Sequence, residues 1–306
     1  MFQQNFDSGL LAGTPSPYGA DLGAYLSHAG LLNREFSNQT ISVLQQLREN
    51  RIPYYQFRDI PVTEQVPPTP THYLPAIPGK TFQSEGVIGA VALELGRLFN
   101  YRETSALIMH DIYPARGYEN SRSFVNSTRM LSFHTDGSAR PDLSPDYLLL
   151  YCLRGDPQAA NLVIDLDTLV EHLPDEVIDI LMQPLFRHLV SESPEQFVVK
   201  PVLFREGGQV TVKYDEDNTS GINDEADHSL QILNAMLREH AVRIPNHANS
   251  LLVLNNNSCL HARTCFSPGF DGADRWIKCA YVTTKDIANG SILSLSLPAG
   301  AAAKPA

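Results

Sequence analysis

The residues best placed to do chemistry are His134 and Asp136, which lie two positions apart in the segment 133–137. Residues 130–133 are predicted to form a short strand that runs into a turn marked by Gly137. In an extended segment residues i and i+2 point to the same side, so this imidazole and this carboxylate can bind one ion. A non-haem Fe(II) site of the facial-triad type needs one more imidazole and leaves positions open for co-substrate and oxygen. We therefore predict His134 and Asp136 as two of the three protein ligands of a catalytic Fe(II).

The third ligand has to come from a distant part of the chain. A His-x-Asp/Glu triplet is expected about once by chance in a chain of this composition, so the motif needs support from elsewhere. Among the other histidines, His261 differs because it follows an apolar strand at 251–254 and a turn of three asparagines. The remaining histidines fall on predicted helices, in loops or at the end of an apolar run, where a structural or solvated role is expected. His261 is therefore the leading candidate.

Arg275 lies 14 positions beyond His261, at the start of another apolar strand. A 2-oxoacid co-substrate chelates iron through its C1 carboxylate and C2 carbonyl, and its far carboxylate needs a planar, two-pronged cation at a fixed distance. Arg275 meets that requirement. A metal-dependent isomerase, or a cysteine- or quercetin-type dioxygenase on a related barrel, would use the three metal ligands without a keto acid and would not need this arginine.

The elements that must position these residues are many short strands with helices between some of them. Helices are predicted over 38–50, 85–100, 165–183 with a break at Pro174, and 224–242, and strands over 53–57, 146–153, 161–164, 196–204, 209–214, 251–254 and 276–282. Residues 1–36 are predicted as an irregular arm with one short helix around 22–26, residues 61–83 as a Pro-rich loop, and residues 291–306 as a disordered tail. With no internal repeat and no Gly-rich phosphate loop, the pattern favours a mainly β, barrel-like or sandwich-like sheet buttressed by the amino-terminal helices.

Composition excludes several classes of protein. The chain has 306 residues, of which 43% are hydrophobic and 19% charged, enough to bury a sizeable core. The net charge of -11 and the lack of a Lys/Arg cluster argue against a nucleic-acid partner. No signal-peptide pattern and no stretch of membrane-spanning length is found, so a cytoplasmic enzyme without membrane association is expected. The four cysteines lack the paired spacing of a zinc or redox site, which indicates free thiols.

The combination of His134-x-Asp136, His261 and Arg275 in the segment 270–276 resembles the clavaminate-synthase-like, taurine dioxygenase-related branch of the Fe(II)/2-oxoglutarate oxygenases. That branch includes hydroxylases of free arginine, lysine and asparagine. The resemblance covers residues 85–284 and implies a double-stranded β-helix, a jelly-roll of the cupin type, in a single oxygenase domain over 1–290. It implies His134, Asp136 and His261 as the iron ligands and Arg275 as the 2-oxoglutarate clamp.

The resemblance also implies an activity and its cofactors. Fe(II), 2-oxoglutarate and O2 would be used to hydroxylate an unactivated C–H bond of a small substrate, with decarboxylation of 2-oxoglutarate to succinate and CO2. The expected substrate is a cationic amino acid or an amino-acid-derived metabolite. Asp136 argues against halogenation, because halogenases of this superfamily have a small residue at that position. Desaturation or cyclisation in natural-product biosynthesis stays open, and so does a non-enzymatic, cupin-like sensor of a small molecule.

Two positions depart from the family pattern. Relatives commonly have a Thr before the short strand that follows the motif, where it touches the co-substrate, and Asn161 is the candidate substitute in this chain. Several amino-acid hydroxylases have a second arginine four residues beyond the clamp, where it meets the α-carboxylate of the substrate. Here that position is Cys279, so a substrate other than an ordinary α-amino acid stays open.

Three further residues are candidates for contacts with the substrate. In the arginine hydroxylases of this branch, acidic residues on a lid upstream of the distal histidine hold the guanidinium group. Asp215 and Asp217 lie in a similar place, and a solvated loop is the alternative interpretation. Arg122 lies in a polar segment just upstream of the metal motif, where a substrate-contacting loop and a solvated turn are both consistent with the sequence.

Overall fold

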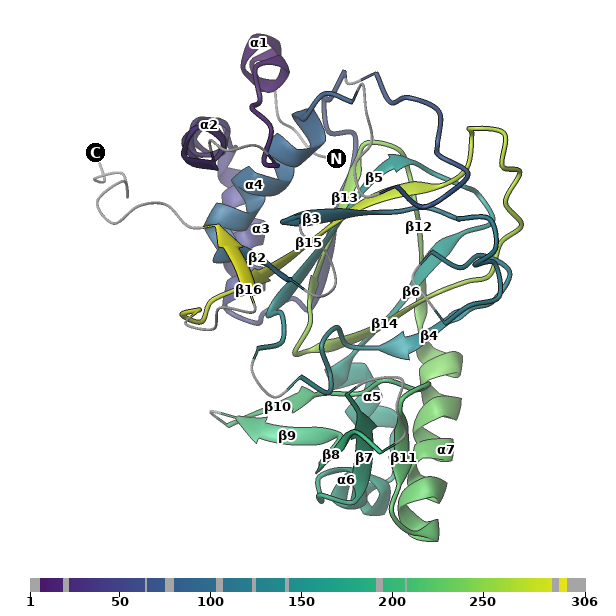
Figure 1. The fold of residues 1–306 in the computed structure, drawn as a ribbon. Helices are drawn as coiled ribbons and strands as arrows, with labels where there is room; N and C mark the ends of the chain where they lie inside the picture. The colour runs from purple at the N-terminus through teal and green to yellow at the C-terminus, as the bar shows by residue number, and fades with distance from the viewer. Residues whose placement is uncertain are drawn as a thin grey trace.

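Two antiparallel sheets face each other and form the centre of the molecule (Figure 1). This computed structural model describes residues 6–18, 22–63, 65–74, 80–102, 107–122, 125–140, 143–190, 195–206, 208–287 and 292–295. The larger sheet has seven strands in the order β1-β13-β5-β15-β2-β16, with β3 paired to β15. Its strands are β1 (Tyr54–Phe57), β2 (Arg97–Tyr101), β3 (Met109–Ile112), β5 (Tyr147–Arg154), β13 (Ser250–Asn255), β15 (Trp276–Thr283) and β16 (Ile292–Leu295). The smaller sheet has the order β12-β6-β14-β4, with β4 (Leu131–His134), β6 (Ala160–Asp165), β12 (Val242–Pro245) and β14 (Cys259–Arg263).

The central strands of the larger sheet are covered on both faces. Leu148 and Leu150 of β5 pack with Val163 of the smaller sheet in one core cluster, between the sheets. Leu149 and Tyr151 belong to another cluster, which includes the amino-terminal helices. Successive side chains of a strand point to opposite faces, so a strand covered on both sides must be apolar throughout, as β5 is.

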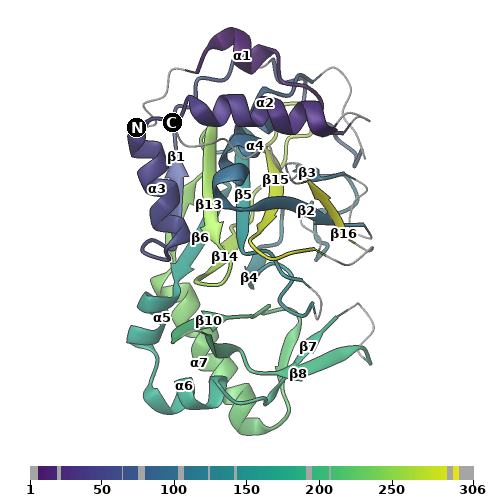
Figure 2. The same ribbon diagram turned by 90° about the vertical axis from the view of Figure 1, so that its left-hand side faces the viewer.

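Four amino-terminal helices cover the outer face of the larger sheet (Figure 2). They are α1 (Ser8–Ala12), α2 (Leu22–Arg34), α3 (Asn38–Arg48) and α4 (Gln83–Leu95). The short helix predicted around 22–26 lies within α2, which runs for 13 residues with one buried side, so the arm predicted as irregular over 1–36 contains both α1 and this longer helix. Tyr25 of α2 packs so closely on Gly89 of α4 that a Cβ there would lie 2.4 Å from the tyrosine hydroxyl. The missing side chain at Gly89 of α4 permits this contact, and the glycines and alanines of α2 hide its helical pattern in the sequence.

Two predicted boundaries also differ from the structure. The helix predicted over 85–100 ends at Leu95, and β2 follows at once. Gly96 makes the change of direction possible, because a Cβ at this position would lie 2.4 Å from the carbonyl oxygen of Thr283. The tail predicted to be disordered contains β16, which pairs with β2. The other residues of 291–306 lie outside the described part of the chain.

Residues between β6 and β12 form an added layer below the smaller sheet (Figure 1). Its elements are α5 (Leu166–His172), α6 (Asp175–Leu181), β7 (Phe186–Leu189), β8 (Phe197–Lys200), β9 (Leu203–Glu206), β10 (Gln209–Val212), β11 (Thr219–Gly221) and α7 (Asp224–His240). The helix break at Pro174 and the β9–β10 hairpin are confirmed. The core of this layer includes Phe133 of β4 and Leu260 of β14, so it supports the two strands that carry the predicted histidine ligands.

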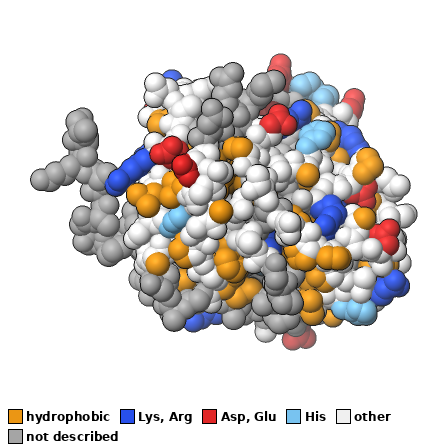
Figure 3. All heavy atoms as spheres, turned by 90° about the horizontal axis from the view of Figure 1, so that it is seen from above, with side chains coloured by type: hydrophobic (Ala, Val, Ile, Leu, Met, Phe, Trp, Pro, Cys, Tyr) orange, Lys and Arg blue, Asp and Glu red, His pale blue; other side chains and the backbone are white. Residues whose placement is uncertain are grey.

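The surface gives no sign of a concentrated charge in the view from above. Figure 3 shows acidic and basic side chains scattered singly over the coloured part of that face. Among the described residues, no helix is both long and apolar enough to cross a membrane. The assignment of one domain to residues 1–290 stays a prediction.

Candidate metal centre and co-substrate pocket

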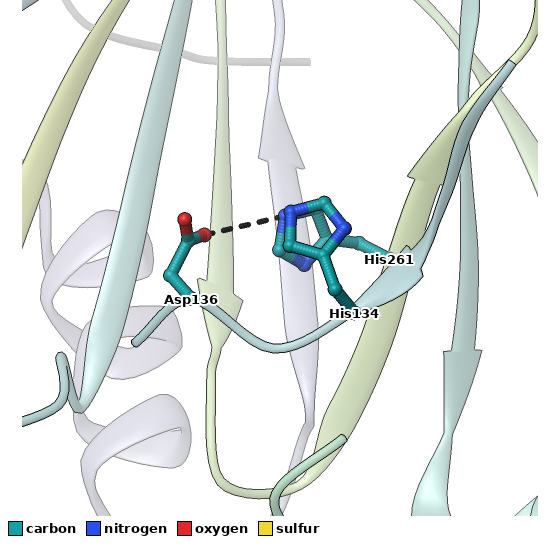
Figure 4. A group of neighbouring side chains, drawn as sticks. All are labelled: His134, Asp136 and His261. Atoms are coloured by element: carbon teal, nitrogen blue, oxygen red, sulfur yellow. Dashed lines mark ion pairs between the residues drawn. The ribbon is translucent and has the colours of Figure 1, made fainter. Parts of the chain in front are cut away.

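His134, Asp136 and His261 converge on one point between the sheets (Figure 4). His134 ends β4, Asp136 lies in the turn that follows, and His261 is in the middle of β14, directly opposite His134. One ligand atom from each side chain lies within 4.8 Å of the other two, near enough for the three side chains to be drawn onto one ion. In the described part of the chain this is the one group of three such side chains. The sequence reading placed His261 in a loop between strands, but the residue belongs to a strand, and the β4–β14 pairing brings it to the motif.

Hydrogen bonds fix how the ligand atoms point. The Nδ1–H of His134 donates to the carbonyl oxygen of Ser132 at 2.8 Å, which leaves Nε2 as the lone-pair donor for a metal. Oδ1 of Asp136 accepts a hydrogen bond from the hydroxyl of Tyr281 at 3.0 Å. Oδ2 of Asp136 has no well-aligned hydrogen-bond partner among the described residues and lies 3.3 Å from Nε2 of His261. One carboxylate oxygen is thus oriented by the protein and the other is available to an ion.

Asn256 holds the backbone of the carboxylate ligand. Its side-chain oxygen accepts the N–H of Asp136 at 2.8 Å, and its amide nitrogen donates to the carbonyl of Asp136 at 2.9 Å and to that of Pro145 at 3.0 Å. The side chain is 1% exposed, so these bonds are protected from water. Sequence reasoning missed this residue, because the asparagine run at 255–257 indicated only a turn.

The charges of the ligands suit a cation. Burial would raise the pKa of the Asp136 carboxyl, but the neighbouring His261 and His134 and the hydroxyl of Tyr281 hold that pKa well below its usual range. Burial and the neighbouring His134 lower the pKa of His261, which favours its neutral form. A carboxylate beside neutral imidazoles is the donor set that a divalent metal requires.

Arg275 lines the same cavity as the three ligands. The cavity is about 80 Å³ in volume and is lined by His110, Ile112, Leu131, His134, Asp136, Leu148, Leu150, Asn161, His261, Ala262, Arg263, Arg275, Cys279 and Tyr281. Arg275 is 4% exposed, and its Nε has no hydrogen-bond partner in the described chain. Burial lowers its pKa to about 10, so the guanidinium stays charged at neutral pH. A buried guanidinium that faces a cavity fits an anion supplied by a ligand.

Other lining residues are held by the protein or kept neutral. The amide nitrogen of Asn161 donates to Oδ1 of Asn246 at 2.8 Å, which leaves its second N–H to donate to an oxygen of the co-substrate. Burial lowers the pKa of His110 to about 4 and raises that of the Cys279 thiol well above its usual value. Sequence reasoning gave His110 a structural or solvated role, and its place in the cavity wall follows from the pairing of β3 with β15.

The three tentative substrate residues lie outside the lining of this cavity. Asp215 bridges to His134 through the backbone, but its carboxylate accepts hydrogen bonds from the N–H of Asp217 and the amide of Asn218. Both oxygens of Asp217 bind Arg129, at 3.0 and 3.1 Å. Arg122 is exposed. The site as it stands therefore brings together the ligands, Arg275 and Asn161, while these three residues are at the rim or beyond it.

A larger cavity of about 510 Å³ lies between α5 and the β9–β10 hairpin and includes Asp165, Asp167 and Glu171. None of the three predicted metal ligands lines it. The chemistry therefore belongs to the smaller cavity between the sheets.

Comparison with known proteins agrees with this geometry. The description "Taurine catabolism dioxygenase TauD, TfdA family" matches residues 89–281. The L-lysine 3-hydroxylase of Catenulispora acidiphila is 26% identical over 285 residues, which cover 87% of this chain and 76% of that protein. Clavaminate synthase 2 of Streptomyces clavuligerus is 28% identical over 244 residues, covering 76% of this chain and 74% of that protein.

Solved structures confirm the jelly-roll. The asparagine oxygenase complex with Fe(II), 2S,3S-3-hydroxyasparagine and succinate superposes with a TM-score of 0.81 at 24% identity, covering 90% of this chain and 88% of that one. The non-haem iron oxygenase OrfP with Fe and α-ketoglutaric acid gives a TM-score of 0.78 at 24% identity, covering 91% and 90%.

The chain belongs to the TauD/TfdA dioxygenase family. It is a 2-oxoglutarate-dependent dioxygenase whose cofactors are Fe(II), 2-oxoglutarate and O2. The predicted fold, enzyme class and cofactors are therefore confirmed. The roles of individual residues remain proposals, and the donor set and the unpaired Arg275 fit them.

Proposed function

We propose that this enzyme hydroxylates an unactivated C–H bond of a small amino acid or amino-acid-derived metabolite, with conversion of 2-oxoglutarate to succinate and CO2. The observation that carries the proposal is the cavity in which a two-histidine, one-carboxylate cluster and a buried, unpaired guanidinium occur together. The relatives support the substrate class, because they are named as hydroxylases or oxygenases of lysine, ornithine, arginine and asparagine.

The residues of the cavity have three proposed roles: binding the metal, binding 2-oxoglutarate and orienting the carboxylate ligand. His134, Asp136 and His261 would hold Fe(II), which when bound with 2-oxoglutarate supplies the oxidising chemistry. Arg275 would bind the far carboxylate of 2-oxoglutarate through its two-pronged guanidinium, and Asn161 would donate the second N–H of its amide to an oxygen of the co-substrate. Asn256 and Tyr281 keep the Asp136 carboxylate in one orientation, so that a metal meets a preformed ligand set.

A cationic side chain on the substrate is part of this proposal and has specific support. The lysine and ornithine/arginine hydroxylases are among the relatives. Asp217 is the acidic group available at the rim, and its pair with Arg129 is partly exposed, at 22% and 38% of the two side chains. A substrate cation would therefore bind the Asp217 carboxylate beside Arg129 and share it with that residue.

The test is anaerobic addition of Fe(II) and then 2-oxoglutarate to the purified apoprotein. Bidentate keto-acid ligation gives a weak visible charge-transfer band, and we expect this band in the wild type and its loss in His261→Ala. Iron binding without the band would contradict the co-substrate role and favour the sensor. With the band present, amino acids are screened for succinate release, and the product mass separates hydroxylation, a gain of one oxygen, from desaturation or cyclisation, a loss of two hydrogens.

A cytoplasmic location is also proposed. All four cysteines are free, and three of them are buried. Unpaired thiols fit a reducing compartment better than an oxidising one.

A further inference from the structure

One wall of the cavity offers no charge to a substrate carboxylate. Arg275 directly precedes β15 and Cys279 lies in the middle of that strand, and both residues line the cavity. β3 pairs with β15 beside them, and His110 lies directly opposite Cys279. This wall, completed by Ile112 and Tyr281, is therefore made of a thiol, an imidazole, a phenol and an aliphatic chain.

Two guanidinium groups line the cavity, and the protein itself uses one of them. Nη1 of Arg263 donates to the carbonyl of Thr264, and its Nη2 donates to Asn126 and to the carbonyl of Arg129. Within the described part of the chain, Nε is the one nitrogen of this guanidinium without a partner. Arg275 makes no comparable set of bonds, which leaves it for 2-oxoglutarate. A carboxylate of the substrate in the same cavity would then have no guanidinium group left for a two-pronged ion pair.

The arginines near the rim of the cavity either contact other side chains of the protein or are exposed to solvent. Arg129 is bound by both oxygens of Asp217, Arg140 stacks over the ring of Tyr101 with its guanidinium carbon 4.0 Å from the centroid, and Arg122 is exposed. The segments between residues 6 and 295 that the structure leaves undescribed contain no Lys or Arg in the sequence. Among the described residues, Arg263 and Arg275 are the cations that line this cavity.

We propose that the substrate is an amino-acid derivative whose α-carboxyl group is masked as an amide, ester or thioester, and that Cys279 and His110 face this neutral group. The inference rests on the function proposed above and narrows its substrate class. A free carboxylate here would lose its hydration without gaining an ion pair, and it would lie close to Asp136 and the two carboxylates of 2-oxoglutarate. A neutral carbonyl requires only hydrogen bonds, which the thiol and the imidazole can supply.

The test compares matched pairs of substrates with the Fe(II)-loaded full chain. Lysine, arginine and asparagine are each supplied as the free acid and as the α-amide, and substrate-dependent succinate release and product mass are measured. We expect kcat/KM for the amide to exceed that for its acid by about tenfold or more. A free acid that is the better member of its pair overturns the inference and leaves the proposed function intact. If neither series responds although the charge-transfer band forms, the amino-acid class and this inference both fail.

Two variants test the wall itself. Cys279→Arg adds the missing cation, and we expect it to shift the preference towards the free acid. Cys279→Ser keeps a small neutral side chain and should retain the preference for the amide. If Cys279→Arg fails to fold, as judged by thermal unfolding, the wild-type comparison decides alone. A folded Cys279→Arg that has the same acid-to-amide ratio as the wild type would contradict the assignment of Cys279 to the carboxyl end of the substrate.

Discussion

Charge is buried on both sides of the larger sheet around β15, but the charges on the outer side are paired with one another and those on the inner side line the cavity. On the outer face, Nζ of Lys278 lies 2.6 Å from Asp111 and 3.3 Å from Glu85, and Nζ of Lys80 lies 2.6 Å from the other oxygen of Glu85. Two positive and two negative groups thus balance beneath α4, and Trp276 adds a hydrogen bond to Asp111 at 2.7 Å.

On the inner side, charged groups line the cavity and have atoms without a hydrogen-bond partner among the described residues. Arg275 and Asp136 are directed into the cavity, and Nε of the first and Oδ2 of the second have no hydrogen-bond partner in the described chain. Buried polar atoms are normally satisfied, so such atoms in one cavity indicate ligands. Paired charges beneath α4 therefore serve stability, and the unpaired charges in the cavity serve binding.

The largest effect is expected on the outer face, from Glu85→Gln. The change removes the anion that lies between Lys80 and Lys278 and leaves buried positive charge without compensation. We expect the free energy of unfolding, measured with denaturant, to fall by about 3–5 kcal/mol. Glu49→Gln is the matched control, because Glu49 pairs with Arg51 on the surface and should change stability by less than about 1 kcal/mol. If the two variants lost the same unfolding free energy, the buried ion pairs of Glu85 would contribute no more to stability than the surface ion pair of Glu49.

The same carboxylate predicts a pH dependence. Burial would raise the pKa of Glu85, but Lys278 and Lys80 lower it from the usual 4.5 to about 2. Because the folded-state pKa is the lower one, the stabilisation is fully present above about pH 4.5 and is lost as the pH falls towards 2. The unfolding free energy of the wild type should fall over this window by about 3 kcal/mol more than that of Glu85→Gln. Parallel curves for the two proteins would show that Glu85 is not responsible.

The sequence could predict the site residues that lie close together along the chain, but not the contacts that depend on strand pairing. His134 and Asp136 are two residues apart in one strand and turn, so local geometry alone brings them together. Arg275 was found because its place at the start of a strand fits the family pattern. Asn256 and His110 were missed, because their contacts depend on which strands pair and on where the turn after β13 lies. Sequence periodicity reports which face of an element is buried, but it does not report what lies across from it.

A smaller effect is expected on the inner face from Arg275→Met. Methionine keeps an aliphatic stem of similar length and removes the charge, so packing is largely retained. We expect the dissociation constant for 2-oxoglutarate, followed by the charge-transfer band, to rise about 100-fold, or about 2.7 kcal/mol. The apoprotein should be no less stable than the wild type, because an uncompensated buried charge is lost. A large loss of stability with unchanged 2-oxoglutarate affinity would place Arg275 among the structural charges.

The smallest effect is expected from Asn256→Ser, which removes the bonds to both backbone groups of Asp136 without touching a ligand atom. Less well-oriented ligands bind metal more weakly, so the Fe(II) dissociation constant should rise about 10–100-fold. The matched control is Asn100→Ser. Asn100 is also fully buried, and it likewise bridges two backbone groups, the carbonyl of Leu107 and the N–H of Tyr101. Both variants should lose stability, and only Asn256→Ser should lose iron affinity. Equal iron affinity in the two variants would show that Asn256 supports the fold rather than the orientation of the carboxylate ligand.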